Sequence, residues 1–254
     1  MAVETMSVAL HSPSTIFSPR HVPSWLLLAF GAGSVNAGAF LACERFVTHV
    51  TGTVTRLGLD AGLWTLMLDY GIVLGCFIAG AMASVLALDA RFHRGKAPLH
   101  ALPLGIVATM LVGVALAGRL GAFGAFGQTV ETAGAFALLS LLGFAMGLQN
   151  AAVASTTGLA IRTTHMTGPA SDLGVHLATA YFTSGEARRA ALRMASLRAG
   201  KILAFTLGAV AMVPLARAAQ YGAFLVPAAA IVLAALLSFH PSRVRPLAPA
   251  PAAT

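Results

Sequence analysis

The chain has 254 residues, of which 57% are hydrophobic and only 9% carry a charge, whereas soluble domains are about 25% charged. So few charges cannot cover a water-facing surface, which excludes an ordinary soluble protein and predicts an all-α integral membrane protein in a lipid bilayer. The formal net charge of +8 would suggest nucleic-acid binding in a soluble chain. Here the basic residues lie between apolar segments, where they orient the chain and contact anionic lipid, so no nucleic acid is expected.

The first expected element is a flexible polar lead over residues 1–23, which lacks the basic start and early apolar core of a signal peptide. A membrane-spanning helix needs about 20 apolar residues. Six segments of this kind follow, at 24–43, about 64–88, 101–118, about 132–154, about 200–217 and about 221–240. All six should be helices because the bilayer core offers the backbone no other partner. A flexible tail is expected over 241–254.

The distribution of basic residues predicts the topology. If the N-terminus is cytoplasmic, the segments on that side hold twelve Lys and Arg residues and the segments on the other side hold four. Because basic residues concentrate on the cytoplasmic side of membrane proteins, we expect both termini in the cytoplasm.

The two halves of the chain contain matching motifs in the same order. The matched pairs are VNAGA (35–39) with QNAAV (149–153), THVTG (48–52) with THMTG (164–168), and FIAGAMA (77–83) with FTLGAVA (205–211). The chain therefore divides into two repeats, 24–118 and 132–240, each with three predicted spans. Because three is odd, the second repeat must enter the membrane from the opposite side, as in many secondary transporters. We name residues 48–52 and 164–168 the first and second THxTG segments.

Two polar THxTG segments that approach from opposite faces could meet near the membrane midplane. Glycine permits an unwound backbone, threonine hydroxyls can coordinate a solute, and histidine can exchange a proton near neutral pH. The candidate substrate-binding residues are Asn36, Thr48, His49, Thr51 and Gly52 from the first half, and Asn150, Thr164, His165, Thr167 and Gly168 from the second half.

Each polar candidate also has a purely structural interpretation. His49 and His165 either carry protons or bind solute, or else their rings cap helix ends. Two histidines without further Cys, His or carboxylate ligands give no convincing zinc site, so neither a metal nor a cofactor is expected. Asn36 and Asn150 either line a polar path or form interhelical hydrogen bonds, each worth about 0.6–2 kcal/mol.

Three charged residues stand out beside the repeat. Arg56 and Asp172 occupy matched positions with opposite charge, so we hypothesise an ion pair that gates or braces the centre. The alternative is two separate residues at the membrane interface. Asp69 is the only charge in the second apolar segment. Because it lies about one turn from the start of that segment, a headgroup position is favoured over a buried coupling carboxylate.

The phrases GSVNAGAF before THVTGTVTRLG, and GFAMGLQNAA before TTHMTGPASDLG, resemble the YoaK-type family of bacterial membrane proteins, a domain family of unknown function. The likeness covers about residues 25–240. It implies about six spans in the bacterial cytoplasmic (inner) membrane and supplies no substrate. The family often has Asn after the first TG, where this chain has Thr53, and Pro169 follows the second TG. A ligand role for that Asn would not carry over to this chain.

The leading functional hypothesis is a small secondary transporter or permease for an unidentified small solute. Its site would lie between the two repeats, and alternating access would come from rocking one repeat against the other. A competing hypothesis is a membrane enzyme that uses His49 or His165 as a general base, and a third is a non-transporting structural protein. No GxSxG, Walker or HExxH motif occurs, which favours a non-enzyme. Homo-oligomerisation is left open.

Overall fold

The structure is all-α throughout the part of the chain that it describes. The computed structural model describes residues 10–11, 15–94, 96–128, 130 and 132–239. The helices are α1 (Val22–Cys43), α2 (Val50–Leu59), α3 (Trp64–His93), α4 (Leu102–Arg119), α5 (Ala133–Thr156), α6 (Thr167–Phe182), α7 (Gly185–Ala219), the 3-10 helix η1 (Gln220–Phe224) and α8 (Leu225–Ser238). No strand occurs within the described ranges, so the predicted helical class is confirmed.

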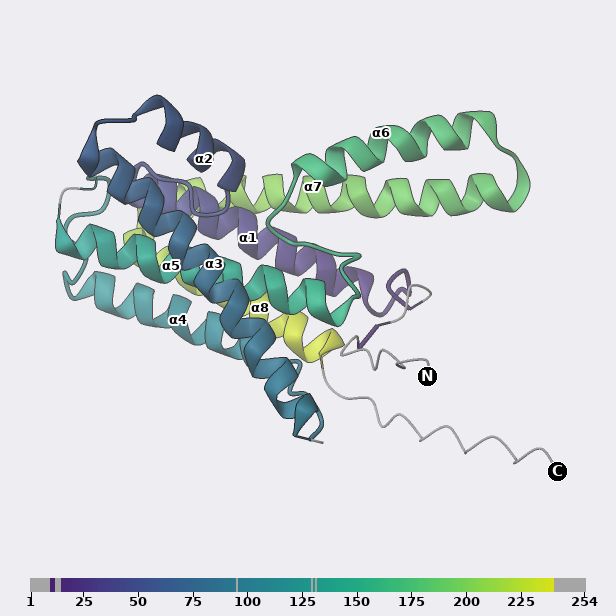
Figure 1. Ribbon diagram of the computed structural model, residues 1–254, viewed down its shortest axis with the longest axis horizontal. Coiled ribbons are helices and arrows are strands. Elements are labelled where there is room, and N and C mark those ends of the chain that lie inside the picture. The colour runs from purple at the N-terminus through teal and green to yellow at the C-terminus, as the bar shows by residue number, and fades with distance from the viewer. Residues whose placement is uncertain (1–9, 12–14, 95, 129, 131, 240–254) are drawn as a thin grey trace.

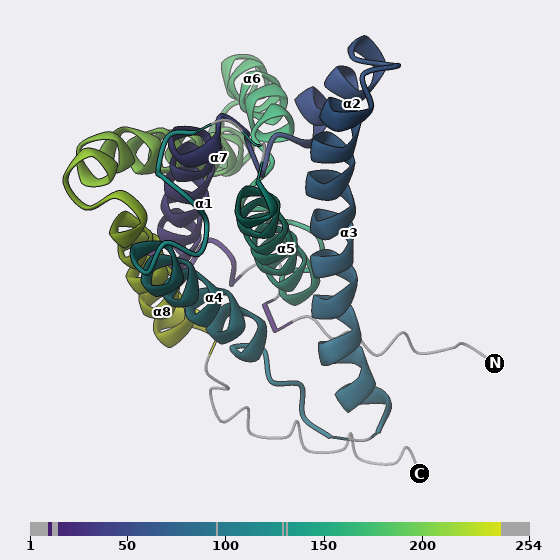
Figure 2. The same ribbon diagram turned by 90° about the vertical axis from the view of Figure 1, so that its left-hand side faces the viewer.

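Five helical runs are long and apolar enough to cross a membrane, namely α1, α3, α4, α5 and the run from Gly185 to Ser238. The first four agree with the first four predicted segments. The predicted segments 200–217 and 221–240 both fall in the last run, which η1 interrupts where Gln220 has a φ of +48°. Figure 2 shows the chain reversing at this turn, so that α8 returns beside α4. The described chain is therefore a multi-pass helical protein, and the count of six spans stays a prediction.

Two shorter helices, α2 (Val50–Leu59) and α6 (Thr167–Phe182), lie between the predicted spans, where no helix is predicted. Each begins within a THxTG segment, α2 at Val50 and α6 at Thr167. The loops 44–49 and 157–166 lead back from the ends of α1 and α5 to these starting points (Figure 1). From there α2 and α6 run outward in opposite directions (Figure 1). The two THxTG segments thus lie near the middle of the molecule rather than at its ends.

Helices α1 and α7 pack closely because glycines lie where they cross. A Cβ built on Gly33 would overlap the carbonyl oxygen of Phe205, and a Cβ built on Gly208 would overlap the carbonyl oxygen of Phe30. The hydroxyl of Ser34 donates a hydrogen bond of 3.0 Å to the carbonyl of Gly208. Small residues let helix backbones approach each other in membranes, so these glycines set the distance between α1 and α7.

The same contact recurs where α3 crosses α5. A Cβ on Gly80 would overlap the carbonyl oxygen of Phe144, and a Cβ on Gly147 would overlap that of Phe77. The residues on α5 stand 114 positions after their counterparts on α1, and those on α7 stand 128 positions after their counterparts on α3. These are the offsets of the matched motifs, so the two halves repeat a three-dimensional contact as well as a sequence.

Part of the predicted flexible lead packs against the bundle. His11 is 5% exposed and Ile16 is 2% exposed. The His11 Nε2 donates a hydrogen bond to the carbonyl of Ser238 at 3.1 Å, and the Trp25 indole donates one to the carbonyl of Ile16 at 3.0 Å. These contacts join the start of α1 to the end of α8. Residues 1–9 and 12–14 of the lead, and the predicted tail 241–254, lie outside the described residues.

Candidate functional site

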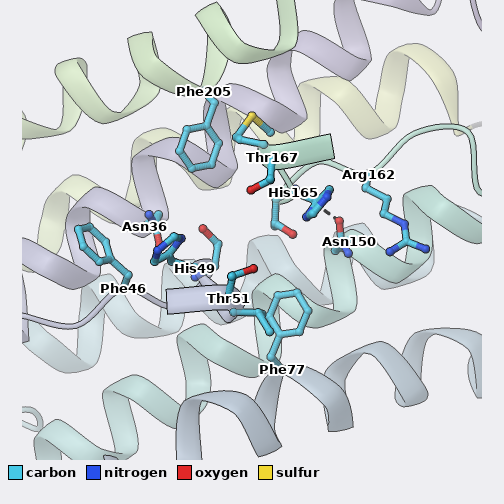
Figure 3. Close-up of a pocket in the computed structure, with 14 residues that line it drawn as sticks. Asn36, Phe46, His49, Thr51, Phe77, Asn150, Arg162, His165, Thr167 and Phe205 are labelled. Atoms are coloured by element: carbon cyan, nitrogen blue, oxygen red, sulfur yellow. Dashed lines mark hydrogen bonds between the residues drawn. The ribbon is translucent and has the colours of Figure 1, made fainter. Parts of the chain in front are cut away.

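A cavity of about 590 Å³ lies between the starts of α2 and α6 (Figure 3). Eight of the ten predicted binding residues line it, namely Asn36, Thr48, His49, Thr51, Asn150, Thr164, His165 and Thr167. Six further lining residues are Phe46, Val50, Phe77, Arg162, Met166 and Phe205. Residues that are more than a hundred positions apart in the sequence therefore face one space.

Asn36 holds the first THxTG segment against α1. Its Oδ1 accepts two backbone hydrogen bonds, from the N–H of Val47 at 3.1 Å and from the N–H of Thr48 at 3.0 Å. The side chain lies about two turns before the end of α1, so the chain must fold back alongside the helix to reach it. These bonds explain how an unwound segment is tolerated away from bulk water, since its freed backbone groups find a partner.

Asn150 does the same in the second half. Its Oδ1 accepts from the N–H of Thr163 at 3.1 Å and from the N–H of Thr164 at 3.4 Å. The neighbouring Gln149 is fully buried, and its Nε2 donates to the carbonyl of Leu28 and to the hydroxyl of Thr163, both at 3.1 Å. The asparagine oxygens thus bond to the backbone of the following loop rather than to another helix, and both side chains also border the cavity.

The two histidine rings cover the two THxTG glycines, which lie outside the cavity lining. A Cβ on Gly52 would overlap the ring of His49, and a Cβ on Gly168 would come 2.8 Å from Nε2 of His165. Nε2 of His165 also accepts a 3.0 Å hydrogen bond from the backbone N–H of Gly168, whereas the His49 side chain makes no such capping bond. A side chain at either position would therefore displace the histidine ring.

Two of the lining threonines present hydroxyls that have no hydrogen-bond partner in the described part of the chain. Thr48 is 7% exposed and Thr164 is 5% exposed, and only their backbone N–H groups are bonded, to the asparagines. Thr51 and Thr167 are exposed to the cavity at the first turns of α2 and α6. The cavity wall therefore offers hydroxyl groups that can donate to or accept from a bound solute.

The predicted ion pair between Arg56 and Asp172 does not form. Asp172 pairs instead with Arg198 of α7, with Oδ2 and Nε 3.2 Å apart. Arg56 is exposed and borders a separate cavity of about 280 Å³. The physical reason is that α2 and α6 diverge from their starting points (Figure 1), so matched positions one to two turns along them move apart.

A buried ion pair lies beside the first half of the site. Asp69 is 2% exposed, and its Oδ2 is 3.1 Å from an Nη of Arg45. The Arg45 guanidinium also lies 5.2 Å from the centre of the Tyr70 ring. The favoured placement of Asp69 at the level of the headgroups stays a prediction, because burial within the protein does not report depth in the bilayer. Arg45 pairs with Oδ2 of Asp69, whereas Oδ1 is buried without a hydrogen-bond partner in the described part of the chain.

Sequence reasoning missed the aromatic and cationic lining of the cavity. Phe77 and Phe205 each open a matched FxxGAxA motif, and Phe46 and Arg162 each stand two residues before a THxTG segment. The repeat therefore carried a signal for Phe77 and Phe205, whereas Phe46 and Arg162 occupy matched positions but differ in type. Figure 3 shows Phe46 and Arg162 toward opposite ends of the cavity, with His49 and His165 between them. Within the described residues, no three His, Cys, Asp or Glu side chains are grouped so as to hold a metal ion.

Long apolar helices around a cavity lined by polar groups define the class as a multi-pass helical membrane protein. The chain belongs to the family described as "Protein of unknown function (DUF1275)", whose model matches residues 24–237. This range nearly coincides with the region of resemblance to the YoaK-type family, and both are families of unknown function. No curated protein and no solved structure matches the chain.

Proposed function

We propose that the protein is a small secondary transporter of the bacterial cytoplasmic membrane, with its solute site between two inverted-topology repeats. The single observation that carries this proposal is that both THxTG segments border one cavity. In secondary transporters built from inverted repeats, the substrate binds near the bilayer midplane where broken helices from the two repeats meet. The starts of α2 and α6, which border the same cavity, support such an arrangement.

The opposite directions of α2 and α6 support inversion (Figure 1). So do the matched glycine crossings, in which α1 and α5 play equivalent roles. The excess of basic residues on one side favours cytoplasmic termini. Single cysteines at Gly62, between α2 and α3, and at Ser184, between α6 and α7, test the topology in a chain freed of its native cysteines. The two cysteines should be labelled from opposite faces of the membrane. Labelling of both from the same face would contradict the inverted arrangement.

The packing suggests which parts move. Helix α1 packs mainly on α7, and α6 packs on α7, whereas α5 packs mainly on α3, and α2 packs on α3. Two packing units result, α1 with α6 and α7, and α5 with α2 and α3, and each includes one long helix of the other half. Helices α4 and α8 pack on each other as well as on α5 and α1, so they join the two units. Alternating access would rock α1, α6 and α7 against α2, α3 and α5, rather than one half of the sequence against the other. The cavity lies between these two units.

Uptake into proteoliposomes from a panel of metabolites tests the transport function. The cavity variant T48A/T164A removes two unpartnered hydroxyls and should reduce uptake. T109A is the matched control, because the Thr109 hydroxyl bonds to its own helix at Gly105 O (2.9 Å) and is remote from the cavity lining. If neither the natural protein nor the control variant transports any member of a panel of anions, cations and neutral solutes, the proposal is contradicted.

A further inference from the structure

The cavity has an uncompensated positive charge. Of its fourteen lining residues, Arg162 alone carries a permanent charge, and none is Asp or Glu. The ion pairs in the described part of the chain join Arg45 to Asp69 and Arg198 to Asp172, so neither neutralises Arg162. An arginine guanidinium without a carboxylate partner is suited to bind a carboxylate or another oxyanion.

The start of α2 adds hydrogen-bond donors at the same cavity. The first N–H groups of a helix have no acceptor within it, and those of Val50 and Thr51, which line the cavity, have none among the described residues. In α6 the equivalent donors are mostly used, because Gly168 donates to His165 and Pro169 has no N–H. The positive end of the α2 dipole and its free amides therefore favour negative charge in the cavity.

The threonine hydroxyls point independently to a polar ligand. Thr48 and Thr164 are more than nine-tenths buried, line the cavity, and use only their backbone N–H groups in hydrogen bonds within the described chain. Neither hydroxyl oxygen is among the fully buried atoms that lack a partner, so the small exposed part of each residue includes its hydroxyl, and a bound oxyanion would accept from both. These hydroxyls come from both halves of the chain, so such a ligand would be held between the two halves.

The remaining wall of the cavity is apolar. Phe46, Phe77, Phe205 and Met166 line it, and Figure 3 shows the Phe77 and Phe205 rings on opposite sides. A strongly hydrated inorganic ion would gain nothing from these side chains. A ligand with an apolar body and one anionic group would contact both kinds of wall, as is usual for small-molecule sites.

We propose that the solute is a small organic anion, held through its anionic group by Arg162, the free α2 amides and the Thr48 and Thr164 hydroxyls, with its apolar body against the phenylalanines. This assignment rests on the proposed transport function, because it names the substrate class of the same cavity. A small monocarboxylate with an apolar body satisfies the chemistry.

Three probes that share one ring test the charge preference, namely benzoate, benzamide and benzylamine, each added to the purified full chain in detergent. A ligand that binds the folded state raises its Tm. Benzoate should raise the Tm more than the neutral amide or the cationic amine does. R162Q should weaken benzoate binding roughly tenfold, R162K should retain part of the binding, and R189Q should bind as the natural protein does. Arg189 is the matched control because it is an exposed arginine outside the cavity lining.

Equal stabilisation by benzamide or benzylamine, no stabilisation by benzoate, or unchanged benzoate binding in R162Q would each overturn the anion assignment. This binding measurement is independent of transport. If benzoate binding depends on Arg162 but no organic anion is taken up into proteoliposomes, the anion site is supported and the proposed transport function is contradicted. Uptake restricted to neutral or cationic solutes would sustain the transporter and contradict the anion site.

Discussion

His165 accepts a 3.0 Å hydrogen bond at Nε2 from the backbone N–H of Gly168, three residues further along the chain. This bond caps the first turn of α6, and it requires the ring tautomer that carries its hydrogen on Nδ1. His49 covers Gly52 in the matched position without a capping bond. The two histidines of the repeat are therefore equivalent in placement and different in bonding.

Substitutions of His165 can distinguish its hydrogen bond to Gly168 from a chemical role of the imidazole ring. His165 precedes the N-cap residue Met166, and the side-chain oxygen of Asn can accept the same N–H bond, so H165N should retain the thermal stability of the natural protein. H165F should lose this hydrogen bond, at a cost of about 0.5–1.5 kcal/mol. Thermal unfolding in detergent and uptake should be measured together. If H165N is as stable as the natural protein but inactive in uptake, the ring itself takes part in transport; if it is active, His165 serves the fold alone.

Replacing either asparagine should destabilise the THxTG segment that it holds. N36A would leave the N–H groups of Val47 and Thr48 without their acceptor, and an unsatisfied buried group costs about 1–3 kcal/mol. N36D keeps an oxygen at the same place and should lose much less. N150A should have a smaller effect than N36A, because one of its two hydrogen bonds is longer at 3.4 Å. Equal Tm values for N36A and N36D would contradict the bracing role.

Adding a methyl group at a helix crossing should separate two helices. In G33A and G147A the new Cβ would overlap a backbone carbonyl, of Phe205 and Phe77 respectively, and overpacking typically costs about 1–3 kcal/mol. The matched control is G75A, because Gly75 lies in α3 with no atom within 4 Å of its built Cβ. In a helix, Ala at such a site is favoured over Gly by about 0.5–1 kcal/mol. The Tm should therefore fall for G33A and G147A and rise for G75A.

The sequence repeat allowed most of the cavity lining to be predicted, but it gave no information about the ion pairs. THVTG and THMTG led to six lining residues, and VNAGA and QNAAV led to two more, because recurrence at matched positions reports a shared three-dimensional role. The same logic failed for Asp172, whose partner Arg198 corresponds to Tyr70 in the first half, at the 128-residue offset. Charges that have diverged between the halves leave no trace in a self-comparison.

The short helices were equally hidden from sequence reasoning. The α2 sequence, VTGTVTRLGL, is rich in β-branched residues and contains two glycines, both of which disfavour helix. Its helical conformation comes from tertiary contacts, since Asn36 places its start and α3 packs beside it. Propensity and periodicity within ten residues do not contain that information.

Breaking the pair between Arg45 and Asp69 should cost more than removing both charges. The Asp69 side chain is 3% exposed and the Arg45 side chain is 17% exposed, so either partner left alone keeps a largely desolvated charge. We expect D69N and R45M each to be destabilised by about 3 kcal/mol, and R45M/D69L to be less destabilised than the sum of the two. Thermal unfolding of the natural protein and the three variants completes a double-mutant cycle. Additive effects would show that the two residues act independently.

Acid should release the N-terminal segment from the end of α8 through His11. Burial, reinforced by the nearby His21 and His100 and opposed by the hydrogen bond to the Ser238 carbonyl, lowers the pKa of His11 from 6.5 to about 4. The neutral ring is thus favoured in the packed state, and the released segment binds the proton more readily. The packing is at full strength above pH 6.5 and weakens progressively as the pH falls toward 4.

Trp25 can report this release, because the His11 and Trp25 rings lie in an edge-to-face arrangement with their centres 5.1 Å apart. In a W64F background Trp25 is the sole tryptophan of the chain, and its fluorescence should change between pH 6.5 and 4. H11F keeps an aromatic ring against Trp25 and Phe239 but cannot bind a proton, so the acid transition should disappear. A transition that persists unchanged in H11F would assign it to His21 or His100, whose pKa values are also lowered, principally by burial.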